Sequence, residues 1–358
     1  MDFSKQPDFN NPRQVGMNWL ITGGCGFIGT NLIKYLVHQG NHCIRIVDNL
    51  SVGTTDDLEK VCAFKYKKVE DLSNSFGEGE YLVEFIKGDL LDEQLSLKAA
   101  QGADVIIHLA ANTGVAPSVK DPRFDCITNV IGTLNYLEAS RHNQVKRFVL
   151  ASSGGTVIGE CKPPIHEEMV PHPVSPYGAS KLAAEGYCSA YFGTFGIETV
   201  ALRFSNVYGP GSSHKNSVVA KFIRRVLAGN SLEIYGDGTQ SRDFIFIDDL
   251  VKAIYNAATV PNIGGEVFQI ATNQETTVNE LAKKLKSVFT ALKIENIKID
   301  YTDSKPGEIK RNFSDTSKAQ EILNWHHEVE LDDGLKQTVI WFLEEINKFR
   351  SSNLINNG

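Results

Sequence analysis

A glycine-rich turn near the start of the chain constrains the fold more than any other feature. Gly23, Gly26 and Gly29 stand at three-residue spacing between an apolar run, residues 18–22, and a segment with helical periodicity, residues 28–39. In that setting the first glycine permits a tight turn, the second lets the backbone approach a pyrophosphate, and the third allows a helix to pack closely on the sheet. The turn therefore predicts a strand–turn–helix unit that binds a dinucleotide, although glycines also occur in plain turns.

The residues that follow this turn predict which dinucleotide is bound. A helix start offers free N–H groups and a positive dipole to phosphates, so Phe27 and Ile28 are predicted contacts. The second predicted strand ends at Asp48 and Asn49, about 20 residues further on. The Asp48 carboxylate can accept from both ribose hydroxyls and would repel a 2′-phosphate, which favours NAD over NADP. Two residues after the third strand are predicted near the adenine: Asp89 and Leu90.

Short apolar runs alternate with helical segments through the first half of the chain. This rhythm is typical of βαβ units around a parallel sheet. The predicted strands are residues 18–22, 43–47, 82–87, 105–109, 147–151 and 199–203, and the predicted helices are residues 28–39, 129–142 and 177–195. Residues 57–80 are polar and weakly periodic, which predicts a surface excursion. The fold class predicted is α/β, a Rossmann-type doubly wound parallel sheet.

After Arg203 the rhythm changes and turn residues become frequent. Helices are predicted around 217–227, 278–292 and 316–324, and strands at 244–247 and 267–271. We expect a dinucleotide-binding domain over 17–204, to which 243–272 return. A smaller, discontinuous α/β domain over 205–242 and 273–347 would hold the substrate.

Length and charge limit the partners. A chain of 358 residues suggests about two lobes at roughly 150 residues per domain. It carries 36 Lys and Arg against 43 Asp and Glu, a net charge of −7. That balance argues against a nucleic-acid or membrane-surface partner, because both favour a basic face.

The cysteines and the N-terminus predict the compartment. Six cysteines are scattered without a Cys-x-x-Cys pair or a zinc-like His cluster, so we expect reduced thiols and no metal site. Residues 1–16 lack the apolar core of a signal peptide. No apolar stretch approaches the ~20 residues that a membrane span requires. A soluble, cytoplasmic protein is expected.

A tyrosine and a lysine four residues apart supply the candidate reacting groups. Tyr177 and Lys181 would share one face of a helix. A phenol with a pKa of about 10 is a weak base at neutral pH, but an adjacent ammonium lowers that pKa. Lys181 could also donate to the nicotinamide ribose. An exposed Tyr–Lys pair without function is the alternative interpretation.

Taken together, these motifs resemble the extended short-chain dehydrogenase/reductase family. The resemblance rests on the glycine turn, Asp48, the Tyr177/Lys181 pair and three further segments: 108–111, 152–153 and 202–210. It covers the chain from about Trp19 to Trp325. Within the family the chain is similar to NAD-dependent nucleotide-sugar epimerases and dehydratases, above all those of the UDP-glucose 4-epimerase type.

The resemblance implies roles for further residues. Tyr177 would take a proton from a sugar hydroxyl while bound NAD accepts a hydride, and a 4-keto sugar would then turn and be reduced on its other face. Additional cofactor contacts would be Leu109, Ala110, Ala111 and Asn129. The UDP-sugar would be held by Ser118, Asn206, Leu232, Ile234, Tyr235, Arg242, Lys305 and Asn312. Without the resemblance, Arg242 would be interpreted as a surface ion-pair residue, and the apolar substrate contacts in 232–235 as core residues. His108, which begins the segment 108–111, is expected to be structural rather than catalytic.

The segment 151–159 bears on which reaction is catalysed. Gly154 stands where the family carries a Ser or Thr that bonds the tyrosine, so Ser153 or Thr156 would supply this hydroxyl. A 4,6-dehydratase of the family has an Asp-Glu pair where this chain has Gly155 and Thr156, and a decarboxylase has Glu at the second position. Epimerisation, which needs no extra acid, fits best.

Three alternatives stay open at this point. A 4-epimerase is favoured. Whether it acts on UDP-glucose and UDP-galactose, or on N-acetylated or uronate forms, stays open, because Asn312 is intermediate in size between residues typical of each specificity. A dehydratase or decarboxylase is the second interpretation, and a protein that only binds NAD or a nucleotide-sugar is the third. A homodimer is implied by the resemblance, through the Tyr/Lys helix and its neighbour, which carries Leu134 and Leu137.

Overall fold

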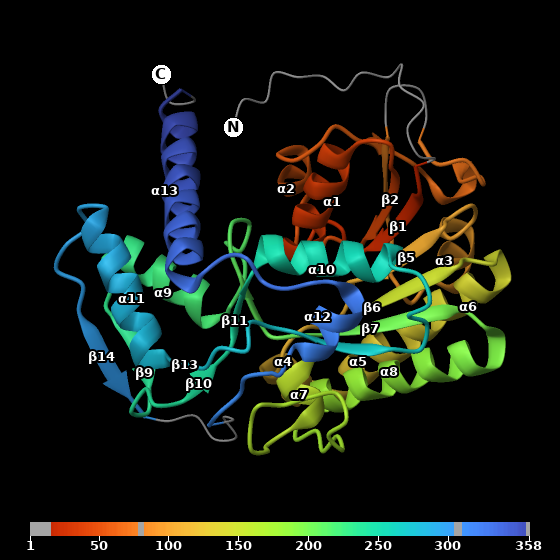
Figure 1. Ribbon diagram of the computed structural model, residues 1–358. Helices are drawn as coiled ribbons and strands as arrows, with labels where there is room; N and C mark the ends of the chain where they lie inside the picture. The colour runs from red at the N-terminus through yellow and green to blue at the C-terminus, as the bar shows by residue number, and fades with distance from the viewer. Residues whose placement is uncertain (1–15, 78–81, 304–309, 356–358) are drawn as a thin grey trace.

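Eight parallel strands form the main sheet of the computed structural model, which describes residues 16–77, 82–303 and 310–355 (Figure 1). Their order across the sheet is β12-β7-β6-β5-β1-β2-β4-β3. The strands are β1 (Asn18–Thr22), β2 (Cys43–Asp48), β3 (Lys65–Tyr66), β4 (Val83–Lys87), β5 (Val105–His108), β6 (Arg147–Ser153), β7 (Glu198–Phe204) and β12 (Val267–Ile270). Because the order turns outward in both directions from β1, the sheet is doubly wound, as predicted.

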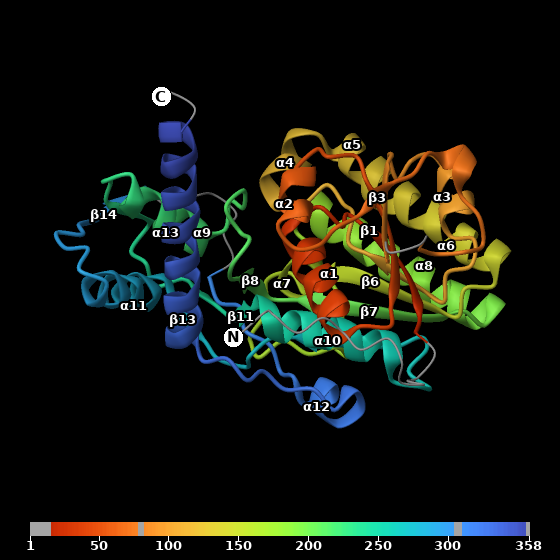
Figure 2. The same cartoon turned by 90° about the horizontal axis from the view of Figure 1, so that it is seen from above.

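Helices cover both faces of this sheet, which explains why its strands are nearly continuous apolar runs. One face carries α3 (Glu93–Ala99), α6 (Gly132–Asn143) and α8 (Pro176–Phe195), and the other carries α1 (Phe27–Gln39) and α10 (Ile247–Thr259). Figures 1 and 2 show α8 and α10 on opposite sides of β6 and β7. Alternate strand residues serve the two cores: Leu20 faces the α6 side, whereas Trp19 and Ile21 face the α10 side.

Short helices fill the connections at the carboxyl ends of the strands. They are α2 (Thr55–Glu59), the 3-10 turn Val69–Asp71, α4 (Val115–Lys120), α5 (Pro122–Cys126), a π-helical turn (Ile127–Ile131) and α7 (Gly154–Ile158). The π-helical turn lies between α5 and α6 and packs on α8.

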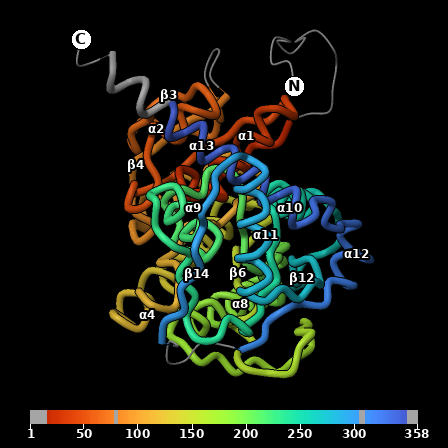
Figure 3. The backbone as a smooth tube through the Cα atoms, turned by 90° about the vertical axis from the view of Figure 1, so that its left-hand side faces the viewer, coloured from red at the N-terminus to blue at the C-terminus, as the bar shows by residue number. Residues whose placement is uncertain are grey.

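A second group of elements lies beside one end of the sheet (Figures 1 and 3). It contains β8 (Asn206–Tyr208), α9 (Val218–Leu227), β9 (Leu232–Tyr235), β10 (Ser241–Arg242), β11 (Phe244–Phe246), β13 (Thr276–Thr277), α11 (Val278–Ala291), β14 (Ile299–Thr302) and α13 (Leu331–Ile355). The strands pair two by two: β8 with β11, β9 with β14 and β10 with β13. Helix α12 (Ser317–Leu323) crosses back to pack on β12 and α10.

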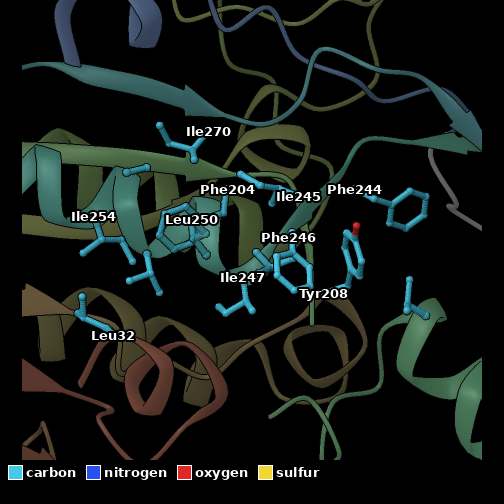
Figure 4. Packing of buried hydrophobic residues seen from close by; sticks show 14 of the residues in the cluster. Leu32, Phe204, Tyr208, Phe244, Ile245, Phe246, Ile247, Leu250, Ile254 and Ile270 are labelled. Carbon is cyan, nitrogen blue, oxygen red and sulfur yellow. The ribbon is translucent and has the colours of Figure 1, made fainter. Parts of the chain in front are cut away.

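An aromatic cluster joins the two groups where β8 and β11 lead into α10 (Figure 4). The Tyr208 and Phe246 rings meet edge to face at 5.6 Å between centroids. Gly334 of α13 lets that helix approach, because a Cβ there would lie 2.2 Å from the Tyr208 hydroxyl. Contacts of this kind add about 0.5–1.5 kcal/mol per aromatic pair beyond the apolar area buried.

The structure departs from the predicted elements in several places. Helices α10 and α13 were not predicted, and the predicted helix 129–142 begins only at Gly132, after the π-helical turn. The polar stretch 57–80 includes β3, which pairs with β4 at the sheet edge. The chain leaves the sheet after β7 and returns with β12; where the domain boundaries fall stays a prediction.

Within the described ranges, no helix is long and apolar enough to cross a membrane, and no group of three or more His, Cys, Asp or Glu side chains is arranged to hold a metal ion.

Candidate functional site

The predicted cofactor residues follow the carboxyl ends of the parallel strands. Because those ends meet at one edge of the sheet, Gly23 after β1, Asp48 at the end of β2 and Leu109 after β5 lie at the same edge. In open α/β sheets, ligands bind outside this edge, where the strand order reverses. Here the reversal is at β1, between β2 and β5.

The glycine turn has the shape that a pyrophosphate requires. Gly23 adopts a φ of +72°, and a Cβ at this position would lie 2.8 Å from the Ala110 amide nitrogen. Gly29 packs against the turn itself, since its Cβ would lie 2.5 Å from the Gly23 carbonyl oxygen. A Cβ on Gly26 would meet only that carbonyl, at 3.3 Å. Gly26 therefore leaves one side of the helix start open, which fits a phosphate above the first N–H groups of α1.

Asp48 is held in place by the backbone around it. Its two carboxylate oxygens accept from the Cys25 and Leu50 amides at 2.9 and 2.8 Å. Burial raises the pKa of Asp48, and these two hydrogen bonds oppose the rise. Each oxygen retains a lone pair for a ribose hydroxyl. Beyond Asp48, Asn49 donates to Asp89 at 3.0 Å and so ties the ends of β2 and β4 together.

Tyr177 and Lys181 lie in the first turns of α8, whose start the local sequence specifies well. Ser175 is the N-cap and accepts from the Gly178 amide at 3.1 Å, and Pro176 occupies the first helical position. Lys181 is 4% exposed, and its ammonium donates to the Ala151 carbonyl at 2.9 Å. The ammonium also lies 5.9 Å from the centre of the Tyr177 ring.

Burial sets the proton affinities of this pair. It lowers the pKa of Lys181 to about 8, although Asp125 and Glu185 oppose the change. It raises the pKa of Tyr177, and the negative charge of Asp125 adds to the rise. In this structure burial and Asp125 therefore act against the expected lowering of the Tyr177 pKa by Lys181, because both disfavour the phenolate.

Thr156 is brought against the turn that carries Tyr177. A Cβ on Gly178 would lie 2.0 Å from the Thr156 carbonyl oxygen, so only glycine lets α7 and α8 approach this closely. The Thr156 hydroxyl is buried and has no hydrogen-bond partner in the described part of the chain. Ser153, at the end of β6, is partly buried, as Thr156 is. Which of the two predicted hydroxyls serves Tyr177 stays a prediction. Gly178 was not singled out, since its role depends on a contact between two elements.

Two side-chain amides fill the space beside the Gly154–Gly155 pair. A Cβ on Gly154 would lie 2.5 Å from Gln269 Oε1, and one on Gly155 would lie 1.8 Å from Asn312 Nδ2. The predicted substrate residue Asn312 is therefore next to the end of β6, and Gln269 of β12 joins it. Gln269 carried no sequence signal, because only strand pairing places it there.

On the substrate side, the β8–β11 pair places Asn206 beside Asp243, the residue that follows Arg242 in the chain. Asn206 pairs with Phe244 across these strands, and its backbone amide donates to the carbonyl of Asp243 at 3.0 Å. Arg242, on β10, donates to the Ser241 carbonyl at 2.7 Å. Tyr235 is partly exposed. Lys305 lies outside the described residues.

Some predicted contact residues are too deeply buried to touch a ligand. Leu232 and Ile234 are completely buried in the core of the second group, so their assignment to a pocket wall is corrected to core packing. Ser118 is also fully buried, and its hydroxyl donates to the Val115 carbonyl within α4. His108 is buried between aromatic rings, and burial lowers its pKa to about 3, which agrees with a structural role.

The remaining predicted cofactor residues line the same edge of the sheet. Leu109, Ala110 and Ala111 are partly buried, and the Ala110 amide donates to the Thr22 hydroxyl at 3.2 Å. Leu90 packs against Gly132, where a Cβ would lie 1.4 Å from its Cδ1. The first contact joins the segment after β5 to the end of β1, and the second joins the segment after β4 to α6.

Comparison with known proteins agrees with this geometry. Residues 19–271 match the family model described as the NAD dependent epimerase/dehydratase family. A putative UDP-glucose 4-epimerase of Methanocaldococcus jannaschii is 36% identical over 90% of this chain and 97% of its own length. The solved UDP-N-acetylglucosamine 4-epimerase of Methanobrevibacter ruminantium M1 has a TM-score of 0.82 at 30% identity, covering 93% of this chain and all of its own.

A third relative was solved with a cofactor. The UDP-glucuronic acid 4-epimerase of Bacillus cereus, in complex with UDP-glucuronic acid and NAD, has a TM-score of 0.79 at 30% identity and covers 92% of this chain and 99% of its own. The chain therefore belongs to the NAD-dependent epimerase/dehydratase family, and it is an enzyme that uses NAD.

Proposed function

We propose that the protein is an NAD-dependent 4-epimerase of UDP-sugars. The observation that carries this proposal is the Tyr177–Lys181 pair at the ligand-binding edge of the sheet, beside a turn whose two central residues, Gly155 and Thr156, bear no carboxylate. The site can move a proton to and from a sugar hydroxyl. It has no further acid in this turn to expel water or carbon dioxide.

The protein's own residues supply proton transfer and orientation. Bound NAD contributes hydride removal and return at C4 of the sugar. Tyr177 takes the proton of the 4-hydroxyl and gives it back after the sugar has turned. Because burial raises the pKa of Tyr177, proton removal depends on positive charge beside the phenol, and Lys181 is the protein's own cation there. Thr156 would donate a hydrogen bond to the reacting oxygen and hold it in line.

Asn206, Arg242, Tyr235 and Asn312 are the proposed substrate contacts, with Lys305 as a further cation. Arg242 suits a diphosphate, because a guanidinium fork binds two oxygens at once. Asn312 would meet the sugar itself, since it lies beside the turn that bears Thr156.

A dehydratase is the second candidate, and the packing around Gly155 weighs against it. An acidic side chain there would need the Asn312 amide to move, because even a Cβ would lie 1.8 Å from its nitrogen. The third candidate is a protein that binds its ligands without catalysis. The burial of the Lys181 ammonium beside Tyr177 does not support it, because binding alone does not require a buried cation there.

A panel of UDP-sugars tests the function directly. We expect the purified protein to convert UDP-glucose, UDP-N-acetylglucosamine or UDP-glucuronate, or their C4 epimers, with the product identified by proton NMR. NAD should appear in the supernatant after denaturation, as its absorbance at 260 nm shows. No epimer from any of these sugars, or a 4-keto-6-deoxy product in its place, would refute the proposal.

We also propose a homodimer formed through α4, the π-helical turn and α8. Val119, Ile131 and Tyr187 are 61%, 43% and 41% exposed, which is unusual for large apolar side chains gathered on neighbouring elements. Leu137 of α6 takes no part, because it is buried in the core on that face of the main sheet.

The cysteines bear on the location of the protein. A cytoplasmic location agrees with six free cysteines, and supply of sugars for polysaccharide synthesis would suit the activity.

Charge placed on this surface should separate the dimer. The double variant Val119→Asp, Ile131→Asp is expected to elute as a monomer in size-exclusion chromatography with light scattering, because two carboxylates would have to be desolvated at the interface. Val170→Asp is the matched control, since Val170 is 71% exposed but lies on another segment. A double variant that remains dimeric would place the interface elsewhere.

A further inference from the structure

A buried carboxylate on α5 is not used by the mechanism above. Asp125 is completely buried. One of its oxygens accepts from the side-chain amides of Asn112 and Asn129 at 3.3 and 3.1 Å, while the other has no hydrogen-bond partner among the described residues. Burying a carboxylate with one oxygen unsatisfied is costly unless a charge nearby compensates for it.

Asp125 is connected to the turn that bears the reacting groups. Asn129 also donates to the Ser180 hydroxyl at 3.0 Å, and that hydroxyl donates to the Tyr177 carbonyl at 3.0 Å. The side-chain oxygen of Asn129 accepts from the backbone amide of Asn112 at 2.8 Å. The network thus ties α5 and the segment after β5 to the first turn of α8.

The backbone around Asn129 is unusual in the same place. Asn129 lies in the π-helical turn between α5 and α6, whose residues pack on α8. A π-helical turn is less stable than α-helix and occurs frequently at functional sites. Here Asn129, which lies in this turn, donates to both Asp125 and Ser180.

The negative charge of Asp125 also acts on a buried positive charge, the ammonium of Lys181. No salt bridge joins Lys181 to a carboxylate within the residues that the structure describes. The charged and titratable groups around it are Asp125 from α5, His108 from β5, and Tyr177, Glu185 and Cys188 from α8 itself. Glu185 is already paired with Arg203, which donates to both of its oxygens at 3.0 and 2.8 Å. Of the two carboxylates whose charge acts on Lys181, Asp125 is therefore the one that has no cation of its own in the described structure.

We propose that Asp125 is a positioning residue that balances the buried charge of Lys181 and, through Asn129 and Ser180, fixes the turn that carries Tyr177, so that it sets the pH range in which the site works. This inference rests on the proposed epimerase function for its kinetic part alone.

The direction of the effect follows from the charges. Burial lowers the pKa of Lys181 to about 8, and the negative charge of Asp125 opposes this lowering. The same charge raises the pKa of Tyr177. Removing it lowers both values. The alkaline limb of the pH–rate profile, where Lys181 loses its proton, therefore moves to lower pH.

The variant Asp125→Asn tests this most directly, because the amide oxygen can still accept from Asn112 and Asn129 while the charge is lost. We expect the alkaline limb of the kcat profile to move down by about one pH unit. At pH 8.5 kcat should fall about tenfold with KM nearly unchanged, and at pH 6.5 the loss should be small. Asp125→Glu, which keeps the charge, should restore the alkaline limb, and it serves as the test if the amide variant does not fold.

Asp249→Asn is the matched control. Asp249 is also completely buried, with one oxygen bonded to the Val329 amide at 3.0 Å and the other without a partner among the described residues, but it lies on α10. The variant Asp249→Asn should lower the melting temperature without moving either limb of the pH–rate profile. An unmoved limb in Asp125→Asn, an equal shift in Asp249→Asn, or a displaced limb in Asp125→Glu would overturn the proposal.

A second measurement does not depend on turnover. In the protein as purified, with 13C-labelled lysine, the Lys181 signal is identified by its loss in Lys181→Met. Its NMR titration midpoint should fall in Asp125→Asn and stay in place in Asp249→Asn. An unchanged midpoint refutes the charge-balancing role, whereas absence of epimerisation in the wild type refutes the proposed function alone.

Discussion

Replacing Tyr177 with Phe should lower kcat by about a thousandfold while NAD and the UDP-sugar stay bound. The substitution removes one hydroxyl and keeps the ring that packs beside Lys181. Loss of a general acid–base group typically costs 10²–10⁴-fold in rate. The measurement is the NMR conversion assay, together with NAD released on denaturation and UDP binding by calorimetry.

Tyr187→Phe provides the control for this experiment. It is the same chemical change on the same helix, at a side chain that is 41% exposed and away from the strand ends. We expect it to retain wild-type kcat. If Tyr177→Phe keeps appreciable activity, another residue moves the proton, and Thr156 would be the first to examine.

Replacing Lys181 with Met should abolish activity and yet stabilise the fold at neutral pH. Burial lowers the pKa of Lys181 from 10.5 to about 8, so a buried ammonium costs about 3 kcal/mol of folding free energy below pH 8. The variant also loses the hydrogen bond from Lys181 to the Ala151 carbonyl, which lowers its stability by about 1 kcal/mol. The net expectation is a gain of about 2 kcal/mol in the free energy of unfolding at pH 7.

The pH dependence gives this prediction a distinctive sign. Between pH 8 and 10.5 the folded wild type loses the proton while the unfolded chain keeps it, so wild-type stability rises relative to the variant. Urea unfolding at pH 7 and pH 10 should therefore show the advantage of Lys181→Met shrinking as pH rises. A variant less stable than wild type at pH 7 would contradict the cost assigned to the buried ammonium.

Features carried by local sequence could be predicted well. The glycine turn, seven of the eight strands of the main sheet and the Tyr177–Lys181 spacing all depend on residues that are neighbours in the chain, and the structure has them as expected. Leu232 and Ile234 show the limit of this approach: an apolar strand looks the same whether its side chains meet a ligand or the core, and here they meet the core.

Long-range contacts account for most of what the sequence did not reveal. Gln269 and Asn312 reach the Gly154–Gly155 pair only because β12 joins the sheet and a C-terminal segment returns to it. No sequence pattern singles out Asp125, since its burial and its relation to Lys181 arise from the packing of α5 on α8.

The path of the chain through α10 has a consequence for its synthesis. α10 packs on α1, β6 and β7, and its Tyr255 stacks on Trp19 of β1 at 5.9 Å, yet it is encoded after β8 and β9. A nascent chain that has just completed β7 therefore exposes one apolar face of a nearly finished sheet. That face stays uncovered until the ribosome has made the intervening segment, so the first seven strands do not constitute an autonomous unit, and their final burial waits for the second half of the protein.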